Sequence, residues 1–493
     1  MSSRISAGHG HFDPSVYHAG DVILHGLNAC LVLIILKLLT ANVGAALLGA
    51  LLFALHPLQV ESVAWISETK GLLGNFFCLS GLALQVGRFR WQHVSKTAGW
   101  ALCAGMNLAF ILALLSKPST MAMIPIAWLI QIGFLRRSIM LTTLELLPAA
   151  IAAAAISIVT KLAQGDELLE FIPPLAMRPL IAGDAIAFYL GKLVMPFSLT
   201  VDYGRSPEFV LETNWIRFAW LVPVGLAAGL ALLPYRRFWL LSLAIFVIGF
   251  LPVSGVISFV FQYYSTVSDR YVYLSMFGVS LAVAWFFTVQ RRPLLIVAFS
   301  VVLCVLAVLS IRQGMTWRSS ETLYAHATSV TRNGYLTQSG LGNLYADTGR
   351  QHEAIEHLEQ AAALKPNSGA VHHKLGAALL EVGRADDAVE QFREAARLMP
   401  DNAVARTDLG VALGKAGRSQ EAIEEFERVL QGQPDDVETL VNLVVAYARA
   451  GRRADALAAA QRARTLARTQ RNMRLLLNIE GWLEKNGGQE SRP

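Results

Sequence analysis

A spacing of 34 residues organises the C-terminal part of the chain and restricts its fold more than any other feature. Alanines, glycines, prolines and Gly-Arg pairs all recur at this interval: Ala354, Ala388, Ala422 and Ala456; Gly342, Gly376 and Gly410; Pro366, Pro400 and Pro434; Gly349–Arg350, Gly383–Arg384, Gly417–Arg418 and Gly451–Arg452. Small residues let two helices pack closely, glycine suits the turn between them, and proline follows the second helix. The period therefore predicts stacked helical hairpins.

This spacing is that of the tetratricopeptide repeat. We expect repeats at 335–368, 369–402 and 403–436, and a decayed fourth at 437–470 in which Val444 and Arg468 replace the glycine and the proline. Residues 312–334 are expected to form a linker helix, and residues 471–493 a capping helix and a tail. Such arrays curve, and their concave face usually holds a protein or peptide segment. The expected groove residues are Asn343, Lys374, Asp408 and Asn442. A rigid spacer or a homo-oligomer contact is the alternative.

Apolar runs dominate the first 311 residues, and most are long enough to cross a bilayer. Only 32 of these 311 residues are charged, 19 basic and 13 acidic, whereas residues 312–493 contain 23 basic and 23 acidic residues. We therefore predict an all-α protein: a polytopic transmembrane domain (1–311) followed by an α-solenoid. The ten expected spans are 22–39, 42–57, 71–88, 98–115, 120–135, 141–162, 215–233, 238–255, 271–290 and 293–311.

Basic residues in short loops indicate the orientation of these spans, because such loops usually face the cytoplasm. One loop holds Arg88, Arg90 and Lys96, and three more hold the pairs Arg136–Arg137, Arg236–Arg237 and Arg291–Arg292. All four fall on one side only if the run 179–196 is interfacial or re-entrant. We therefore expect an integral protein of the inner or plasma membrane, with the N-terminus and a periplasmic solenoid on the non-cytoplasmic side. No apolar run precedes this outside N-terminus, so either the first helix inserts with its N-terminus outside unaided or an upstream helix is missing.

Several classes of function are disfavoured by the sequence. It contains no Walker A loop, dinucleotide-binding glycine pattern, HExxH or CxxC motif. The four cysteines lie inside apolar runs, so we expect no metal site. The basic excess belongs to membrane loops, so we expect no nucleic-acid partner.

Polar residues gather at the predicted outer ends of the spans. Ionisable groups are costly near a bilayer and are usually functional or paired. Carboxylates beside lysine, arginine and histidine suit an anionic phosphate substrate and a proton transfer; capping of helix ends is the alternative for any single residue. The nearly charge-free spans disfavour a transporter. The residues concerned are His25, Asn28, His56, Glu61, Lys70, Lys117, Asp202, Tyr203, Asp269, Arg270 and Tyr271.

The segments His56–Glu68, Ser116–Pro118, Val201–Tyr203 and Ser268–Leu274, with Trp317 before the repeats, resemble motifs of the transmembrane-and-tetratricopeptide-repeat (TMTC-like) family. That family is related to GT-C protein O-mannosyltransferases, and the resemblance covers essentially the whole chain. It implies a polytopic enzyme that transfers a sugar from a polyprenyl-phosphate donor to a protein hydroxyl on the non-cytoplasmic side. The lipid-phosphate sugar would be a co-substrate, with no cofactor identified, and the repeats would present the acceptor protein.

The resemblance also implies roles for individual residues. Glu61 and Asp269 are the expected catalytic or acceptor-side carboxylates, and Lys70, Lys117, Arg270 and His56 are expected to bind the donor phosphate. His25, Asn28, Asp202, Tyr203 and Tyr271 are expected to support them. In the family the main catalytic carboxylate follows the first helix, and residues 12–18 resemble the end of that loop. We therefore expect this carboxylate to be missing, and the alternative function is a catalytically inactive, membrane-anchored scaffold that binds partner proteins.

Overall fold

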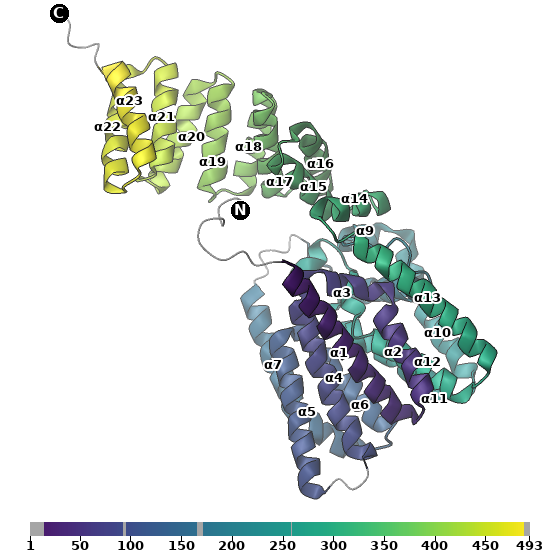
Figure 1. Ribbon diagram of the computed structural model, residues 1–493. Helices are drawn as coiled ribbons and strands as arrows, with labels where there is room; N and C mark the ends of the chain where they lie inside the picture. Colours follow the sequence, from purple (N-terminus) through teal and green to yellow (C-terminus); the bar gives the residue numbers. More distant parts are fainter. Residues whose placement is uncertain (1–13, 92–94, 165–170, 258, 488–493) are drawn as a thin grey trace, which may run out of the picture. The chain divides into compact units, whose positions relative to one another are not determined.

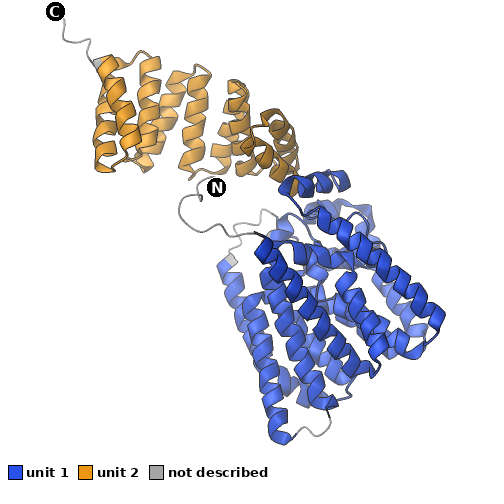
Figure 2. Cartoon of the chain, viewed as in Figure 1, with its two compact units in different colours: residues 1–334 blue, residues 335–493 orange. Residues whose placement is uncertain are grey.

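The computed structural model describes residues 14–91, 95–164, 171–257 and 259–487, and it divides the chain into two compact units, residues 1–334 and 335–493 (Figure 2). The described residues contain helices and no strands, which confirms the all-α class (Figure 1). Residues 12 and 13 of the expected loop and residues 488–493 of the expected tail lie outside the described residues.

The first unit is a bundle of long helices joined by short helical segments. Its helices are α1 (Pro14–Thr40), α2 (Val43–Leu55), α3 (Val60–Ala64), α4 (Thr69–Arg90), α5 (Lys96–Ser116), α6 (Met123–Gly133), α7 (Ile139–Gln164), α8 (Arg178–Val194), α9 (Pro207–Glu212), α10 (Leu221–Leu232), α11 (Arg236–Phe250), α12 (Met276–Val289), α13 (Pro293–Met315) and α14 (Ser320–Val330). The 3₁₀ helices are η1 (Pro57–Gln59), η2 (Ile66–Glu68), η3 (Pro118–Ala122), η5 (Asn214–Phe218), η6 (Leu251–Val253), η7 (Val260–Tyr263) and η8 (Asp269–Val272).

Seven helices among the described residues are long and apolar enough to cross a membrane. The number becomes eight if Val43–Leu55 and Pro57–Ala64, which are bent by 54° relative to each other, count as one span. Two further apolar helices, Pro118–Gly133 and Met276–Val289, are shorter. A helix therefore lies at each of the ten expected spans, and the number that cross stays a prediction. The helix α8 does not meet the length and composition requirement, and its Asp184 is buried against Arg205.

Small residues set the close packing of this bundle. A Cβ atom at Gly81 of α4 would lie 2.6 Å from the ring of Phe110 on α5, and one at Gly278 of α12 would lie 2.5 Å from the Ser242 carbonyl of α11. Small residues at such contacts bring helices close together in membranes, where no hydrophobic effect drives the helices to associate. The resulting core is mostly aliphatic and aromatic. Four of the buried charged residues, Glu61, Glu68, Asp269 and Arg270, lie on the short helices of the unit.

The break after α2 places two buried carboxylates, Glu61 and Glu68, on short helices outside the long helix. His56 ends α2 and caps η1, since its Nδ1 accepts the amide N–H of Leu58, and Pro57 occupies the first position of η1. Proline has no N–H to donate and suits a helix start, so the chain turns here and does not continue α2. Two short helices follow, α3 and η2, and they carry Glu61 and Glu68 respectively.

The expected linker packs on the first unit. The helix α13 runs to Met315, and α14 follows it. The side chains of Gln313 and His326 both donate hydrogen bonds to the Leu199 carbonyl, at 3.2 and 3.0 Å.

The second unit is a series of antiparallel helix pairs. These are α15 (Tyr335–Asp347) with α16 (Gln351–Leu364), α17 (Gly369–Glu381) with α18 (Ala385–Leu398), α19 (Ala403–Lys415) with α20 (Ser419–Gly432), and α21 (Val437–Arg449) with α22 (Arg453–Thr469), followed by α23 (Met473–Gly487). The glycine between paired helices has positive φ, as at Gly349 (80°), which accounts for glycine there. The arginine after each glycine pairs with a carboxylate three residues later: Arg350–Glu353, Arg384–Asp387, Arg418–Glu421 and Arg452–Asp455.

Candidate functional site

Arg270 is the centre of a buried charge network in the first unit. It lies on η8, and its guanidinium forms an ion pair with Glu61. The hydroxyl of Ser268 donates to the same Glu61 oxygen at 2.8 Å, and the amide of Arg270 donates to the other oxygen at 3.2 Å. Glu61 and Arg270 are therefore two halves of one buried pair, contributed by segments 209 residues apart.

A second carboxylate extends this network to Lys117. Glu68 on η2 contacts Arg270 through Oε1, 3.6 Å from Nε, and contacts Lys117 through Oε2, 2.5 Å from Nζ. Gly71, one turn further along α4, leaves room for this contact, because a Cβ there would lie 2.6 Å from Oε2 of Glu68. Carboxylates and cations thus alternate in one series of contacts, in the order Glu61, Arg270, Glu68 and Lys117.

Aromatic rings surround the Arg270 guanidinium. Its central carbon lies 4.1 Å from the ring centroid of Phe261, 4.6 Å from that of Trp65 and 5.0 Å from that of Tyr271. Stacking on π-faces stabilises a guanidinium that has lost most of its water. Burial lowers the pKa of Arg270, but Glu61, Tyr271 and Glu68 together outweigh this effect and the net pKa is raised, so this arginine stays charged.

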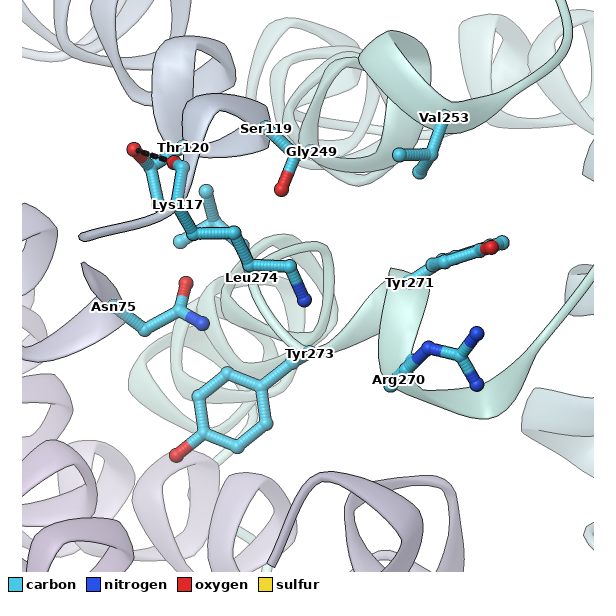
Figure 3. Close-up of a pocket in the computed structure, with 10 residues that line it drawn as sticks. All are labelled: Asn75, Lys117, Ser119, Thr120, Gly249, Val253, Arg270, Tyr271, Tyr273 and Leu274. Carbon is cyan, nitrogen blue, oxygen red and sulfur yellow. Dashed lines mark hydrogen bonds between the residues drawn. The ribbon is translucent and has the colours of Figure 1, made fainter. Parts of the chain in front are cut away.

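Lys117 extends into a small cavity of about 30 Å³ beside this network. Figure 3 shows its side chain crossing the middle of the cavity, with Asn75 and Tyr273 on one side and Arg270 and Tyr271 on the other. The hydroxyl of Thr120 donates to the Lys117 carbonyl at 2.7 Å and fixes the start of η3. The sequence motif Ser116-Lys117-Pro118 therefore places one cation where several segments meet.

A larger cavity of about 800 Å³ shares Lys117, Arg270 and Tyr271 with the small one. Its wall is mostly apolar and includes residues from α7, η3, η6 and the segment 257–261, among them Met121, Ile158, Leu162, Val253, Ile257 and Phe261. The charged residues in its wall are Glu68, Lys70, Lys117, Lys161 and Arg270. Lys70 is exposed and forms no ion pair with a described residue. An apolar wall with several cations suits an amphipathic anion.

Asp269 lies next to Arg270 but belongs to a different group of contacts. Its Oδ1 accepts the hydroxyl of Tyr203 at 2.7 Å, and the side chain is buried. Burial, and then the nearby Glu61 charge, raise the pKa of Asp269 well above its usual range. Neither Glu61 nor Asp269 lines the two cavities around Lys117, and Glu68 is the carboxylate in the described wall of the larger one.

Other predicted site residues support this region or lie away from it. The Tyr273 hydroxyl donates to Nδ1 of His25 at 2.8 Å and accepts from Asn28 at 3.0 Å. These two residues therefore fix Tyr273, which lines the small cavity. Asp202 closes a turn, since it accepts the amide of Gly204 at 2.9 Å. His56 is not brought near Lys117.

The position of His56 follows from the bend after α2. Its Nε2 donates to the Leu193 carbonyl at 3.2 Å, and it lines a separate cavity of about 330 Å³ with His18, His25 and Gln59. The structure thus brings Arg270, Lys117 and Tyr271 together around Glu68 and Glu61, with Lys70 on the wall of the larger cavity, and leaves His56 on another face.

Several residues that shape this site are not among those predicted from the sequence. Tyr189 on α8 is fully buried, donates to the Ser268 carbonyl at 2.9 Å and accepts the Ser268 amide at 2.8 Å, so it holds the segment that positions Arg270. Phe261, Asn75 and Lys161 were missed as well. The sequence offers no marker for them, since each is an ordinary residue in an apolar segment.

The predicted groove residues of the second unit line two hollows. Asn343 and Lys374 line one of about 250 Å³, and Asp408 and Asn442 line another of about 360 Å³. His373 Nε2 donates to Asp408 at 2.7 Å. Among the described residues of the whole chain, no group of three His, Cys, Asp or Glu side chains could hold a metal ion.

Comparisons with known proteins agree with both halves of the sequence interpretation. A TPR repeat family model matches residues 342–383, and a tetratricopeptide repeat model matches residues 407–470. The chain is 26% identical to Protein O-mannosyl-transferase F38B6.6 of Caenorhabditis elegans over 334 residues, which cover 65% of this chain and 46% of that protein. It is 25% identical to Protein O-mannosyl-transferase TMTC4 of Mus musculus over 419 residues, which cover 71% of this chain and 55% of that protein.

These similarities confirm the resemblance to TMTC-like proteins, and the chain spans about half the length of the curated relatives it matches. Among solved structures, the crystal structure of the MamA protein is 24% identical to this chain. The match covers 31% of this chain and 83% of the MamA chain, with a TM-score of 0.30.

Proposed function

We propose that the first unit transfers a sugar from a polyprenyl-phosphate donor to a hydroxyl group of a protein, as a GT-C-type O-glycosyltransferase. The cavity of about 800 Å³ carries this proposal. A polyprenyl phosphate has an anionic head and a long apolar chain, and the cavity has cations beside a mostly apolar wall. The names of the curated relatives, protein O-mannosyl-transferases, favour mannose as the sugar.

The charges of the cavity suit one phosphate. Glu61 and Glu68 offset the charges of Arg270 and Lys117, Lys70 adds a cation that no described carboxylate neutralises, and Lys161 is a further cation in the wall. In the proposed reaction the acceptor oxygen attacks the anomeric carbon, the bond to the phosphate oxygen breaks, and the lipid phosphate leaves with the electron pair. Lysine and arginine at the phosphate stabilise the leaving charge. A carboxylate takes the proton of the acceptor hydroxyl.

Glu61 and Asp269 stay proposed as the acceptor-side carboxylates, and Glu68 joins them because it lines the cavity. The repeats are proposed to hold the acceptor protein, with the groove residues Asn343, Lys374, Asp408 and Asn442 in contact with it. His56, which lines a different cavity, is proposed to act only by fixing the bend after α2.

A transfer assay tests the proposal. Purified full-length chain is incubated with radiolabelled mannosyl-phosphoryl-undecaprenol and a serine- and threonine-rich acceptor protein, and label in the protein is counted. Lys117→Gln should lower transfer by roughly tenfold or more, since a charge-assisted contact to phosphate contributes about 1.5–3 kcal/mol. Lys37→Gln, which removes an exposed lysine at the end of α1, is the matched control. Equal transfer by both variants would contradict the assigned cavity.

A membrane-anchored scaffold without catalysis is the second candidate. The observation that favours it is the engagement of Glu61 with Arg270 and of Asp269 with Tyr203, both behind the cavity wall. The scaffold predicts that the labelled donor lipid binds while no label reaches any acceptor, and that the repeats still capture a partner protein.

We also propose that the repeats lie on the non-cytoplasmic side, because the short loops with arginine pairs should face the cytoplasm. A cysteine-free chain carrying Thr348→Cys, an exposed position in the first repeat, tests this orientation. A membrane-impermeant maleimide should label it in intact cells. Protection in intact cells with labelling after lysis would reverse the orientation.

A further inference from the structure

Six arginines lie in or beside three turns of the first unit, apart from the cavity. The turn between α6 and α7 holds Arg136 and Arg137, Arg236 and Arg237 follow the turn into α11 as its first two residues, and the turn between α12 and α13 holds Arg291 and Arg292. Arg137 is half-buried and the other five are exposed. We call this set the arginine surface.

The three turns converge on one aromatic cluster. The ring centroid of Phe134, at the end of α6, lies 5.1 Å from that of Phe238 on α11. Phe238 stacks on Trp285 of α12 at 3.7 Å, and Tyr235 lies 6.3 Å from the same indole. The Nη2 of Arg237 also donates to the Ile132 carbonyl at 3.0 Å, which ties α11 to α6. The six guanidinium groups therefore share one end of the bundle.

No described carboxylate neutralises this charge. None of the six arginines forms an ion pair with a described residue; Arg137 lies 4.5 Å from the ring centroid of Phe89, and Arg291 donates to the Thr288 carbonyl at 3.3 Å. The nearest acid on a helix that adjoins these turns, Glu145 of α7, is paired with Arg88 at 3.0 Å. Six like charges on one surface repel one another, so an anion supplied from outside would stabilise the arrangement.

We infer that the arginine surface binds the head groups of anionic phospholipids. The aromatic cluster supports a lipid over an acidic protein, because tryptophan and tyrosine at the ends of apolar helices sit at head-group depth. Arginine binds phosphate in a forked geometry, and basic residues at such depth attract anionic lipids. The inference does not depend on the proposed glycosyl transfer.

Lipid binding to the full-length protein in mild detergent tests the inference, since orientation in a membrane plays no part there. Native mass spectrometry would compare phosphatidylglycerol with phosphatidylcholine. The test variant is Arg136→Gln/Arg236→Gln/Arg292→Gln, because these three side chains form no hydrogen bond or ion pair with a described residue. The control is Arg217→Gln/Arg312→Gln/Arg318→Gln. These three arginines are exposed and lie away from the arginine surface: Arg217 precedes α10, Arg312 is in the last turn of α13, and Arg318 follows α13.

The unmodified chain should retain phosphatidylglycerol over phosphatidylcholine, by roughly fivefold for each arginine that contacts a head group. The test variant should lose this preference while its melting temperature stays within a few degrees, and the control should keep it. The triple Arg→Lys variant of the same positions should keep most of the preference. Equal retention of the two lipids by the unmodified chain, an unchanged preference in the test variant, or the same loss in the control would each overturn the inference.

Discussion

The Nζ atom of Lys117 lies 2.5 Å from Oε2 of Glu68, and the other oxygen of that carboxylate faces Nε of Arg270 at 3.6 Å. One side chain therefore holds two cations in the wall of the cavity. Because Glu61 takes the remaining side of Arg270, the positions of the cations depend on carboxylates that come from two short helices, α3 and η2.

Gly71→Ala should disturb this contact without unfolding the chain. The added Cβ would lie 2.6 Å from Oε2 of Glu68 and 3.2 Å from Nζ of Lys117, and both are ends of flexible side chains that can move. Donor-lipid binding should weaken by roughly tenfold, while the melting temperature falls by only a few degrees. Gly26→Ala on α1, where nothing lies within 4 Å, is the control and should bind normally. Normal binding by Gly71→Ala would mean that the Glu68–Lys117 contact does not set the donor site.

Glu61→Gln and Asp269→Asn should differ in stability. Glu61→Gln leaves the buried Arg270 charge without its main partner, a change that typically costs about 3–5 kcal/mol. Asp269 has a raised pKa through burial, so its neutral form is favoured and an isosteric asparagine should cost about 1 kcal/mol or less. Thermal denaturation of the two purified variants measures this difference. Comparable losses would argue against the Glu61–Arg270 pair as the main contact of this region.

The stability of the chain should fall with rising pH through a contribution from Asp269. Its pKa is higher in the folded than in the unfolded chain because burial, and then the Glu61 charge, disfavour the carboxylate. The contribution is fully present below the unfolded pKa, about 3.9, and is lost as the pH rises through the raised folded pKa. Melting temperatures of the unmodified chain and Asp269→Asn, measured from pH 4 upward, should therefore show the smaller fall in the variant. Parallel curves would rule out this contribution.

Gly410→Ala and Gly414→Ala, both on α19, should have opposite effects on the repeats. A Cβ at Gly410 would lie 2.5 Å from the Phe426 ring, whereas one at Gly414 meets only Nη1 of Arg449 at 4.0 Å. Overpacking at Gly410 should cost about 1–3 kcal/mol, and Gly414→Ala should stabilise the helix by up to about 1 kcal/mol. Hydrogen exchange of α19 and α20 in the full-length chain reports both. Faster exchange in Gly414→Ala than in Gly410→Ala would contradict this packing.

The fold class and the family resemblance could be predicted because both depend on local patterns. The 34-residue period describes one helical hairpin, and an apolar run describes one helix, so neither requires knowledge of contacts across the chain. The glycine at each hairpin turn, such as Gly349 with φ of 80°, has a local reason as well.

The site residues were harder to predict, because the sequence indicates how far along a helix a residue lies but not which distant residue it contacts. His56 and Glu61 are five residues apart in one motif, yet after the break at Pro57 His56 lines a separate cavity, whereas Glu61 is buried against Ser268 and Arg270. Glu61 meets Arg270 across 209 residues, and Tyr189 holds Ser268 across 79. No local pattern encodes such distances, so the contribution of Tyr189 and the enclosed position of Asp269 could be found only in the folded chain.

The arginine that follows each turn glycine forms an ion pair with a carboxylate three residues later, so each of the four helical hairpins contains both partners of its own ion pair. None of these four contacts crosses from one repeat to the next. Insertion or loss of one complete 34-residue unit would therefore leave none of these arginines and carboxylates without its partner. As far as these four contacts are concerned, the length of the solenoid can change in whole 34-residue steps.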